Sequence, residues 1–132
     1  MQYNIKMILF HNKNCSKSRK CLEILSSKNV DFNTREYMKD KLTLEEVTHL
    51  LKNLNSDINE ILRDKKLLDI EDINDIKKLA LHLYENPKNM QRPIFFNGKN
   101  YIICRPPERI DEIIWYLNLQ EKVVEGVGFE PT

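Results

Sequence analysis

The most reactive residue type in the chain stands where a predicted strand turns into a predicted helix. Residues 11–19 read His-Asn-Lys-Asn-Cys-Ser-Lys-Ser-Arg and separate the apolar run Ile5 to Phe10 from an amphipathic stretch that begins near Lys17. Cys15 is therefore expected at a helix N-terminus, where unpaired backbone N–H groups and the helix dipole stabilise an anion. Such positions lower the pKa of a cysteine from about 8.5 to roughly 3.5–7.5. The polar and basic neighbours predict a nucleophilic thiolate rather than an inert buried thiol.

Two arginines stand beside prolines at the ends of predicted strands. Arg92 directly precedes a proline that opens a strand, and Arg105 directly follows the next strand. Guanidinium groups present forked donors that match tetrahedral oxyanions and stay charged at any working pH. Together with Cys15 they predict an oxyanion pocket around a nucleophile. The alternative is that they are solvated surface arginines. Spacing alone favours that alternative for Arg63 and does not decide between the two for Arg92 and Arg105.

Length and charge restrict the class of protein. The chain has 132 residues, with 21 Lys and Arg against 20 Asp and Glu, giving a formal net charge of +1. This length suits one domain, and this balance gives no general attraction to nucleic acid or an anionic membrane. No stretch approaches the about 18 apolar residues of a membrane span, and residues 1–10 are too short and too polar for a secretory signal. We expect a cytoplasmic monomer that binds neither nucleic acid nor membrane.

The three cysteines do not form a metal or disulfide framework. Cys15, Cys21 and Cys104 contain no C-x-x-C pair and make an odd number, which argues against a zinc site and against a secreted disulfide scaffold. No metal is expected. Cys21 falls on the apolar stripe of the first predicted helix and is expected in the core. Cys104 precedes Arg105, so it either packs in the core or serves as a second thiol near the pocket, and its alternation in the strand favours packing.

The hydrophobic periods predict the order β-α-β, then helices, then β-β-α. With a thiol after the first strand, this order resembles a thioredoxin-like arrangement: an α/β fold with a four-stranded mixed sheet, flanking helices, and a helical insert between the βαβ and ββα halves. We expect a single domain over residues 1–122 and a disordered tail over 123–132.

The first half is expected to contain a strand Ile5 to Phe10, a helix ending near Lys28-Asn29 and a strand Val30 to Tyr37. The insert is expected to contain a helix after a capping box of Thr43 and Glu46, a short helix Asp57 to Arg63 and a helix from Asp72 to Asn86. The second half is expected to contain strands 94–96 and 101–103 joined by a tight Asn97-Gly98 turn, and a last helix opened by Pro106 or Pro107 with Ile110, Ile113, Ile114 and Leu117 on one face.

The motifs at the cysteine and at both Arg-Pro sites together resemble those of the glutaredoxin-coupled arsenate reductases. Their joint occurrence is specific, whereas any one of them alone is weak. The resemblance runs from about residue 6 to residue 117. The matching motifs are His11-Asn12-x-x-Cys15-Ser16-Lys17-Ser18-Arg19, Asn86-Pro87-Lys88, Arg92-Pro93-Ile94, Asn97-Gly98-Lys99 and Arg105-Pro106-Pro107-Glu108.

This resemblance implies both a nucleophile and a binding site. Cys15 would attack arsenate, and Arg63, Arg92 and Arg105 would hold the oxyanion. The match at Arg63 is a short one, within a region of otherwise variable helix. The resemblance also implies a cis peptide bond before Pro93. It implies no bound cofactor, because glutathione and reduced glutaredoxin would be the electron donors and the partners of the protein.

Two further residues of the cysteine loop acquire roles from the same resemblance. Ser18 stands where a dithiol oxidoreductase would have its resolving cysteine, so this loop cannot close an internal disulfide and an external thiol is required. His11 and Ser18 would help hold the Cys15 thiolate by charge or hydrogen bonding. For His11, a role in packing at the strand end fits the sequence equally well.

Two other functions remain open at this point. A Spx-like regulator, a relative with the same fold, would bind RNA polymerase without reductase activity. Such regulators typically carry C-x-x-C as a redox switch, and the corresponding residues here are Cys15 and Ser18, which disfavours the switch. The third possibility is a reductase-like protein with another substrate, because arginines do not distinguish arsenate from phosphate or sulfate. Only arsenate among these is readily reduced by thiols.

Overall fold

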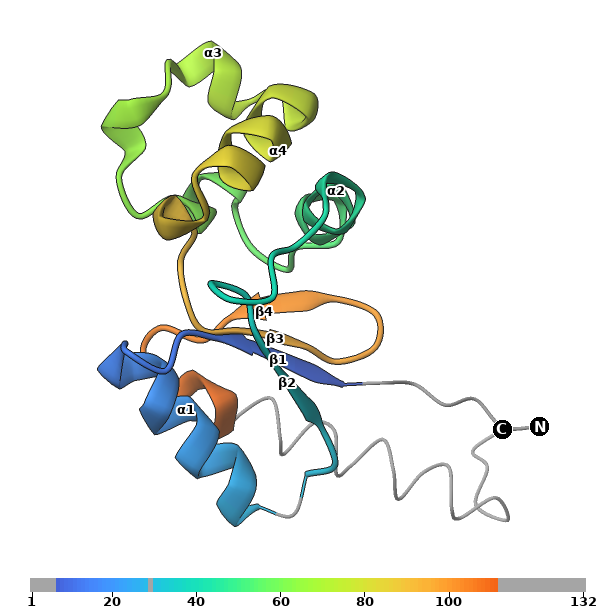
Figure 1. The fold of residues 1–132 in the computed structure, drawn as a ribbon, viewed down its shortest axis with the longest axis vertical. Helices are drawn as coiled ribbons and strands as arrows, with labels where there is room; N and C mark the ends of the chain where they lie inside the picture. Colours follow the sequence, from blue (N-terminus) through green and yellow to red (C-terminus); the bar gives the residue numbers. More distant parts are fainter. Residues whose placement is uncertain (1–6, 29, 112–132) are drawn as a thin grey trace, which may run out of the picture.

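Four strands form one mixed sheet in the order β2-β1-β3-β4 in the computed structural model, which describes residues 7–28 and 30–111 (Figure 1). β1 pairs in parallel with β2 and antiparallel with β3, and β3 pairs antiparallel with β4. The predicted four-stranded mixed α/β sheet is therefore confirmed. The strands are β1 (Ile8–His11), β2 (Asn33–Glu36), β3 (Ile94–Phe96) and β4 (Tyr101–Ile103).

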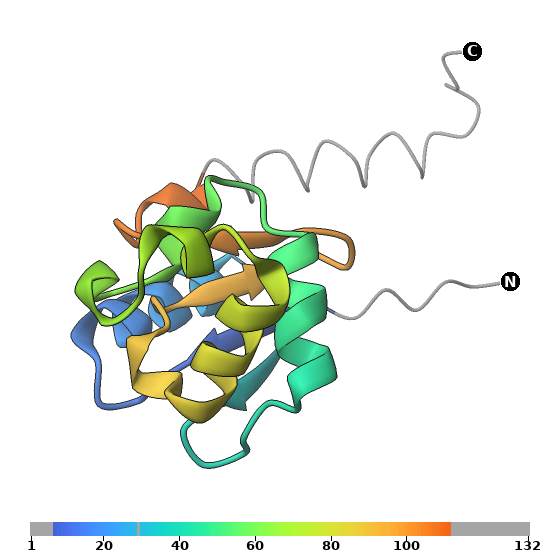
Figure 2. The same cartoon turned by 90° about the horizontal axis from the view of Figure 1, so that it is seen from above.

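Helices cover both faces of the sheet. The helix α1 (Ser16–Ser27) lies on one face, and the predicted helical insert lies on the other, with α2 and α4 extending across the strands (Figures 1 and 2). Several short pieces of the insert are 3-10 helices, labelled η. The insert contains α2 (Leu44–Lys52), η1 (Ile58–Ile61), η2 (Lys65–Leu67), α3 (Ile70–Ile73), α4 (Ile76–Glu85) and η3 (Pro87–Asn89).

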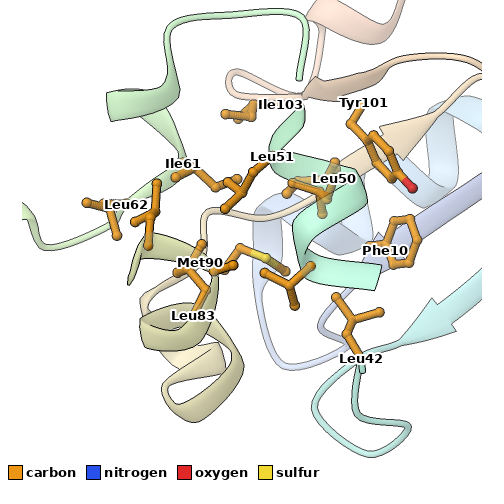
Figure 3. Close-up of a cluster of buried hydrophobic side chains, with 14 of the residues drawn as sticks. Phe10, Leu42, Leu50, Leu51, Ile61, Leu62, Leu83, Met90, Tyr101 and Ile103 are labelled. Atoms are coloured by element: carbon orange, nitrogen blue, oxygen red, sulfur yellow. The ribbon is translucent and has the colours of Figure 1, made fainter. Parts of the chain in front are cut away.

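Alternation along the strands divides the apolar side chains between two cores. In β1, Phe10 joins the core beneath the insert, whereas Leu9 joins the core beneath α1. Neighbouring side chains of a strand point to opposite faces, so a sheet covered on both sides needs apolar residues at nearly every position. Figure 3 shows part of the insert-side core, including Leu50, Leu83 and Phe10. The core beneath α1 consists of Leu9, Cys21, Leu25, Phe95, Ile102, Cys104 and Ile110.

The insert begins as predicted and then departs from the expectation. Thr43 and Glu46 form the predicted capping box at the start of α2. The helix expected from Asp72 begins instead at Ile76, because the Asp75 side chain accepts hydrogen bonds from the backbone N–H groups of the next turn and so acts as the N-cap. The short α3 precedes it. The helix expected over residues 57–63 is the shorter 3-10 helix η1, and η2 was not predicted.

The bounds of the remaining elements also differ from the predictions. The second strand covers only Asn33–Glu36 of the expected residues 30–37. The hairpin loop has four residues, because Phe96 pairs with Tyr101, and the Asn97 side chain accepts from the backbone N–H groups of Lys99 and Asn100. Gly98 provides the positive φ that this loop requires. Of the predicted last helix, only its beginning is described. Ile113, Ile114, Leu117, the end of the expected domain and the expected tail lie outside the described residues.

The segment around α2 fastens the insert to both edges of the sheet. At the β2 edge, the Arg35 guanidinium donates to both carboxylate oxygens of Glu46 in α2, at 2.8 and 3.0 Å. At the β4 edge, Tyr101 donates its backbone N–H to the Asn53 carbonyl (2.9 Å), and its carbonyl accepts from the Asn55 N–H (2.8 Å). The insert is therefore anchored on both sides of the strands that carry the site described next.

Candidate functional site

The sheet topology brings one end of each of the four strands to the same end of the sheet, where β1 and β2 terminate. This end of the sheet is the site edge. Cys15 follows β1, and Tyr37 follows the parallel neighbour β2, whose last residue pairs with the last residue of β1. β3 runs antiparallel to β1, so Arg92 lies just before its start at this same edge. β4 runs antiparallel to β3, which returns Arg105 to the edge, and the Cys104 N–H donates to the Pro93 carbonyl there (3.0 Å). The fold thus gathers residues that are far apart in the sequence.

Cys15 is the N-cap residue of α1, and its loop is held by polar contacts. The Cys15 N–H donates to the Asn12 carbonyl (2.9 Å), and the Asn12 N–H donates to the Ser18 hydroxyl oxygen (3.2 Å). The Arg19 guanidinium donates to the Lys13 carbonyl (2.8 Å). The first turn of α1 carries no acidic residue, so no carboxylate competes for its free N–H groups. These groups are left to face the Cys15 sulfur.

The surroundings of Cys15 stabilise its thiolate. Burial by itself would raise the pKa of this thiol. Hydrogen bonding from the backbone N–H groups of Ser18 and Lys17, from the Arg92 guanidinium and from the Ser18 hydroxyl outweighs the effect of burial and lowers the pKa of Cys15 from 9.0 to about 7. A substantial fraction of the thiol is therefore ionised at neutral pH, which is the form that acts as a nucleophile.

The alkylation rate of Cys15 should rise with pH through a midpoint at about 7, because only the thiolate reacts with iodoacetamide. Cys21 and Cys104 are both 0% exposed, so labelling of the folded protein should occur at Cys15. Mass spectrometry of peptides after timed labelling measures the rate at each cysteine, and labelling of the urea-unfolded chain gives the reference for a free thiol. A midpoint at about 8.5 or higher, the value of an unperturbed cysteine, would contradict the proposed thiolate.

Arg92 and Arg105 lie next to each other at this edge. Nη1 of Arg92 donates to the Lys88 carbonyl (3.1 Å), and its Nε is buried without a partner among the described residues. Nη1 of Arg105 donates to the Arg92 carbonyl (2.9 Å), so the second arginine is tied to the backbone of the first. The bond between Arg92 and Pro93 is cis, as the family resemblance implied. The bond between Arg105 and Pro106 is also cis, which the sequence analysis did not anticipate.

The structure places Arg63 beside the segment that leads to Arg92, and the pocket that Arg63 lines includes neither Cys15 nor Arg92 nor Arg105. Its backbone N–H donates to the Asn89 carbonyl (2.9 Å), and the Gln91 N–H donates to the Ile61 carbonyl (2.8 Å), which places the segment of Arg63 beside the segment that leads to Arg92. The Arg63 side chain is exposed. It lines a surface pocket of about 380 Å³ together with Asp64, Leu67, Asn86, Lys88 and Asn89.

His11 is buried, and the pKa of its imidazole is lowered by that burial, with the opposing effect of Glu36 too weak to reverse it. The imidazole is therefore neutral near pH 7, and the geometry does not offer a positive charge to the thiolate. Its Nδ1 has no hydrogen-bond partner among the described residues. Ser18 is also buried, and its hydroxyl contributes to the lowered pKa of Cys15.

Cys104 does not share the pocket with Cys15. It packs in the core beneath α1, where hydrogen bonding with Cys21 and then burial raise its pKa, so it is a protonated thiol. This agrees with the packing role that the sequence favoured. Cys21 is fully buried in the same core, as predicted.

Tyr37 is the residue of this edge that the sequence analysis missed. The sequence predicts it only as the end of a strand, but its side chain is 1% exposed and the charges of Arg92, Cys15 and Arg63 influence the pKa of its hydroxyl. The available signal was its position directly after a strand parallel to β1, since the carboxyl ends of parallel strands lie at the same edge.

The fold and the site define a protein with one activated cysteine at the start of the first helix of a β2-β1-β3-β4 sheet, beside a pair of arginines. The sequence model of the ArsC family matches residues 10–113 of the chain. The chain belongs to the ArsC family, and its fold is the thioredoxin-like fold of that family.

Three relatives illustrate the range of this similarity. An arsenate reductase of Haemophilus influenzae is 30% identical over 117 residues, which cover 83% of this chain and 100% of the relative. The solved structure of an arsenate reductase from Vibrio cholerae has a TM-score of 0.71 and 28% identity, and the match covers 84% of this chain and 99% of that one. The regulatory protein MgsR of Bacillus subtilis is 28% identical over 108 residues, covering 77% of this chain and 85% of the relative. No helix within residues 7–28 and 30–111 has the length and apolar character needed to cross a membrane.

Proposed function

We propose that the protein is an arsenate reductase that takes its electrons from glutathione and glutaredoxin. The observation that carries this proposal is the Cys15 thiol, whose pKa of about 7 is partly due to the adjacent Arg92 guanidinium. The nucleophile therefore lies beside a group whose charge and donors suit an oxyanion. The names of the Haemophilus and Vibrio relatives support arsenate as the oxyanion.

The proposed reaction begins with attack of the Cys15 thiolate on pentavalent arsenic. An S–As bond forms, and one arsenate oxygen leaves as water after protonation. The guanidinium groups of Arg92 and Arg105 offset the negative charge on the remaining oxygens, and Arg63 would add its positive charge as the third arginine of the proposed site. A glutathione thiolate then attacks the Cys15 sulfur, and the S–As electron pair stays on arsenic, which leaves as trivalent arsenite.

The cycle is closed by an external thiol. The second step leaves a mixed disulfide between Cys15 and glutathione, and a glutaredoxin thiolate attacks its glutathione sulfur to release the Cys15 thiolate. Ser18 cannot form a disulfide, and the other two cysteines are buried in the core beneath α1, so the site offers no internal thiol for this step. These donors place the proposed reaction in the cytoplasm, where thiols are kept reduced.

The test is to incubate the protein with arsenate, glutathione, glutaredoxin, glutathione reductase and NADPH and to measure arsenite directly. We expect arsenite to form in proportion to protein concentration and NADPH to be consumed in equal amount. Reactions lacking the protein measure the uncatalysed background, and reactions lacking either glutathione or glutaredoxin test the donors. Arsenite formation no faster than the background would refute the proposed activity. Full activity without glutathione would refute the proposed donor only.

A transcription regulator is the second candidate, because the relative MgsR is a regulatory protein. The Spx-like alternative would bind RNA polymerase through the same fold. The presence of Ser18 three residues after Cys15 disfavours the dithiol switch that such regulators typically use. Specific capture of RNA polymerase, combined with arsenite formation at the background rate, would favour this second function over the first.

A further inference from the structure

Tyr37 carries a buried hydroxyl that the protein itself does not pair. The side chain is 1% exposed, yet its Oη makes no well-formed hydrogen bond among the described residues. The Arg92 guanidinium lies close enough to lower the pKa of Tyr37 by hydrogen bonding, but a guanidinium can only donate, so the Tyr37 O–H is still left without an acceptor. Buried polar atoms are normally satisfied, so an orphaned one calls for an explanation, such as a role in binding a ligand. Tyr101, which lies at the opposite end of the sheet, shows the ordinary arrangement. It is also buried, and its hydroxyl lies 2.8 Å from Nδ1 of His49.

The hydroxyl lies at the same end of the sheet as the reactive thiol, near enough for the charge of Cys15 to raise the pKa of Tyr37. Tyr37 follows β2 directly, at the edge where β1 ends and the Cys15 loop begins. Arg92, which influences Cys15 from one side, also influences Tyr37, and Arg63 does so as well. The hydroxyl is therefore influenced by the charges of the nucleophile and of two of the three arginines proposed to hold the substrate.

The hydroxyl is a hydrogen-bond donor at the working pH. Burial raises the pKa of Tyr37, and the nearby Cys15 thiolate adds to the increase, while Arg92 and Arg63 act in the opposite direction. The group consequently keeps its proton when Cys15 is ionised. A protonated phenol can donate to an anion at the position where an ionised one would repel it.

A second unpaired donor lies beside it. Nε of Arg92 is buried and has no partner among the described residues, although another nitrogen of the same guanidinium is held by the Lys88 carbonyl. Two orphaned N–H and O–H donors next to a nucleophile are what a bound oxyanion would satisfy, since its oxygens accept hydrogen bonds from several directions. The free-energy cost of leaving these two donors unpaired in the free protein would be recovered when the oxyanion binds.

We propose that the Tyr37 hydroxyl donates a hydrogen bond to an oxygen of the tetrahedral oxyanion bound at Cys15, as a neutral donor beside the arginines of the site. The proposal rests on the proposed arsenate reduction, because it assigns a further ligand to that substrate. The Tyr37 ring packs in the core beneath the insert, whereas its hydroxyl would contact the bound substrate.

The test compares wild type, Tyr37→Phe and Tyr101→Phe by protection of Cys15 from iodoacetamide as arsenate is added without glutathione. Labelling at about pH 8.5 keeps Cys15 ionised in each variant, because its pKa is about 7. For Tyr37→Phe we expect the half-protecting arsenate concentration to rise by roughly 10- to 100-fold, the effect of losing one hydrogen bond to a charged ligand. For Tyr101→Phe, which removes a hydroxyl from the same core at the far end of the sheet, it should stay unchanged.

Thermal unfolding without oxyanion separates ligand binding from a structural role. Tyr37→Phe should unfold close to the wild-type temperature, because the hydroxyl makes no well-formed hydrogen bond to the described residues. Tyr101→Phe should unfold at a lower temperature, because its bond to His49 is lost. The proposal is overturned if Tyr37→Phe is protected by arsenate as well as the wild type is, or if it loses as much stability as Tyr101→Phe. Failure of arsenate to protect even the wild type would overturn both this proposal and the proposed function.

Discussion

The Cys15→Ser variant should form arsenite at the uncatalysed background rate, a loss of roughly 10³-fold or more, as is usual when a nucleophile is removed. A serine hydroxyl stays protonated near neutral pH and cannot form a mixed disulfide, so both chemical steps fail. Cys15 is only half-buried at the N-cap of α1, where serine is a favoured residue. The variant should therefore remain folded. Arsenite measured in the coupled assay, together with a circular dichroism spectrum of the same sample, provides the comparison.

Cys104→Ala is the matched control for this variant. Cys104 is 0% exposed in the core beneath α1 and contacts Cys21 rather than the pocket. Removing its sulfur should lower the unfolding temperature, because a small cavity is left behind. The rate of arsenite formation per folded molecule should not change. If folded Cys104→Ala loses its activity, or if oxidation links Cys15 to Cys104, then the assignment of Cys104 to the core is wrong.

The Arg92→Lys variant should lose roughly 10- to 100-fold in kcat/KM for arsenate, because lysine keeps the charge but not the forked donors. The pKa of Cys15 should also rise from about 7, because hydrogen bonding from Arg92 helps to lower it. Both quantities can be measured on one preparation, the first by arsenite formation and the second by the pH dependence of alkylation.

Arg109→Lys serves as the control for Arg92→Lys. Arg109 also follows β4, but its guanidinium donates to the Ile103 carbonyl at 3.3 Å and its side chain is exposed. The same substitution there should leave kcat/KM and the pKa of Cys15 within a factor of about two, as expected for a surface position. Equal effects at both positions would show that general positive charge, rather than the Arg92 guanidinium itself, supports the site.

The order of the elements along the chain and the position of the cysteine were predictable, because each depends on local patterns that tertiary contacts reinforce. The apolar run before the Cys15 loop had to be a strand covered on both faces, and the Thr43 capping box set the start of α2. The division at Asp75 was not predictable from periodicity. Ile73 and Ile76 both suit one apolar stripe, and only the capping bonds of Asp75 show that the helix begins again between them.

Cys15, Ser18 and the arginines of the candidate site were named from the sequence, whereas Tyr37 was not. Cysteine and arginine attract attention by their chemistry, whereas a tyrosine after a strand is usually a packing residue. Tyr37 becomes distinctive only through the combination of burial, an unpaired hydroxyl and its neighbours at the sheet edge. The neutral state of His11 also depends on its burial in the fold, which the order of residues alone does not reveal.

The anchoring of the insert at both borders of the sheet has a consequence for self-association. The unpaired backbone groups of an edge strand can form hydrogen bonds with a strand of another molecule, which can start aggregation. Here the backbone groups of Tyr101 already form hydrogen bonds with Asn53 and Asn55, so fewer backbone groups of β4 are free at this edge of the sheet. The free edge of β2 is only four residues long, and it includes Arg35, whose charge is paired with that of Glu46. The contacts that hold the insert in place therefore also protect the protein from strand exchange with its copies.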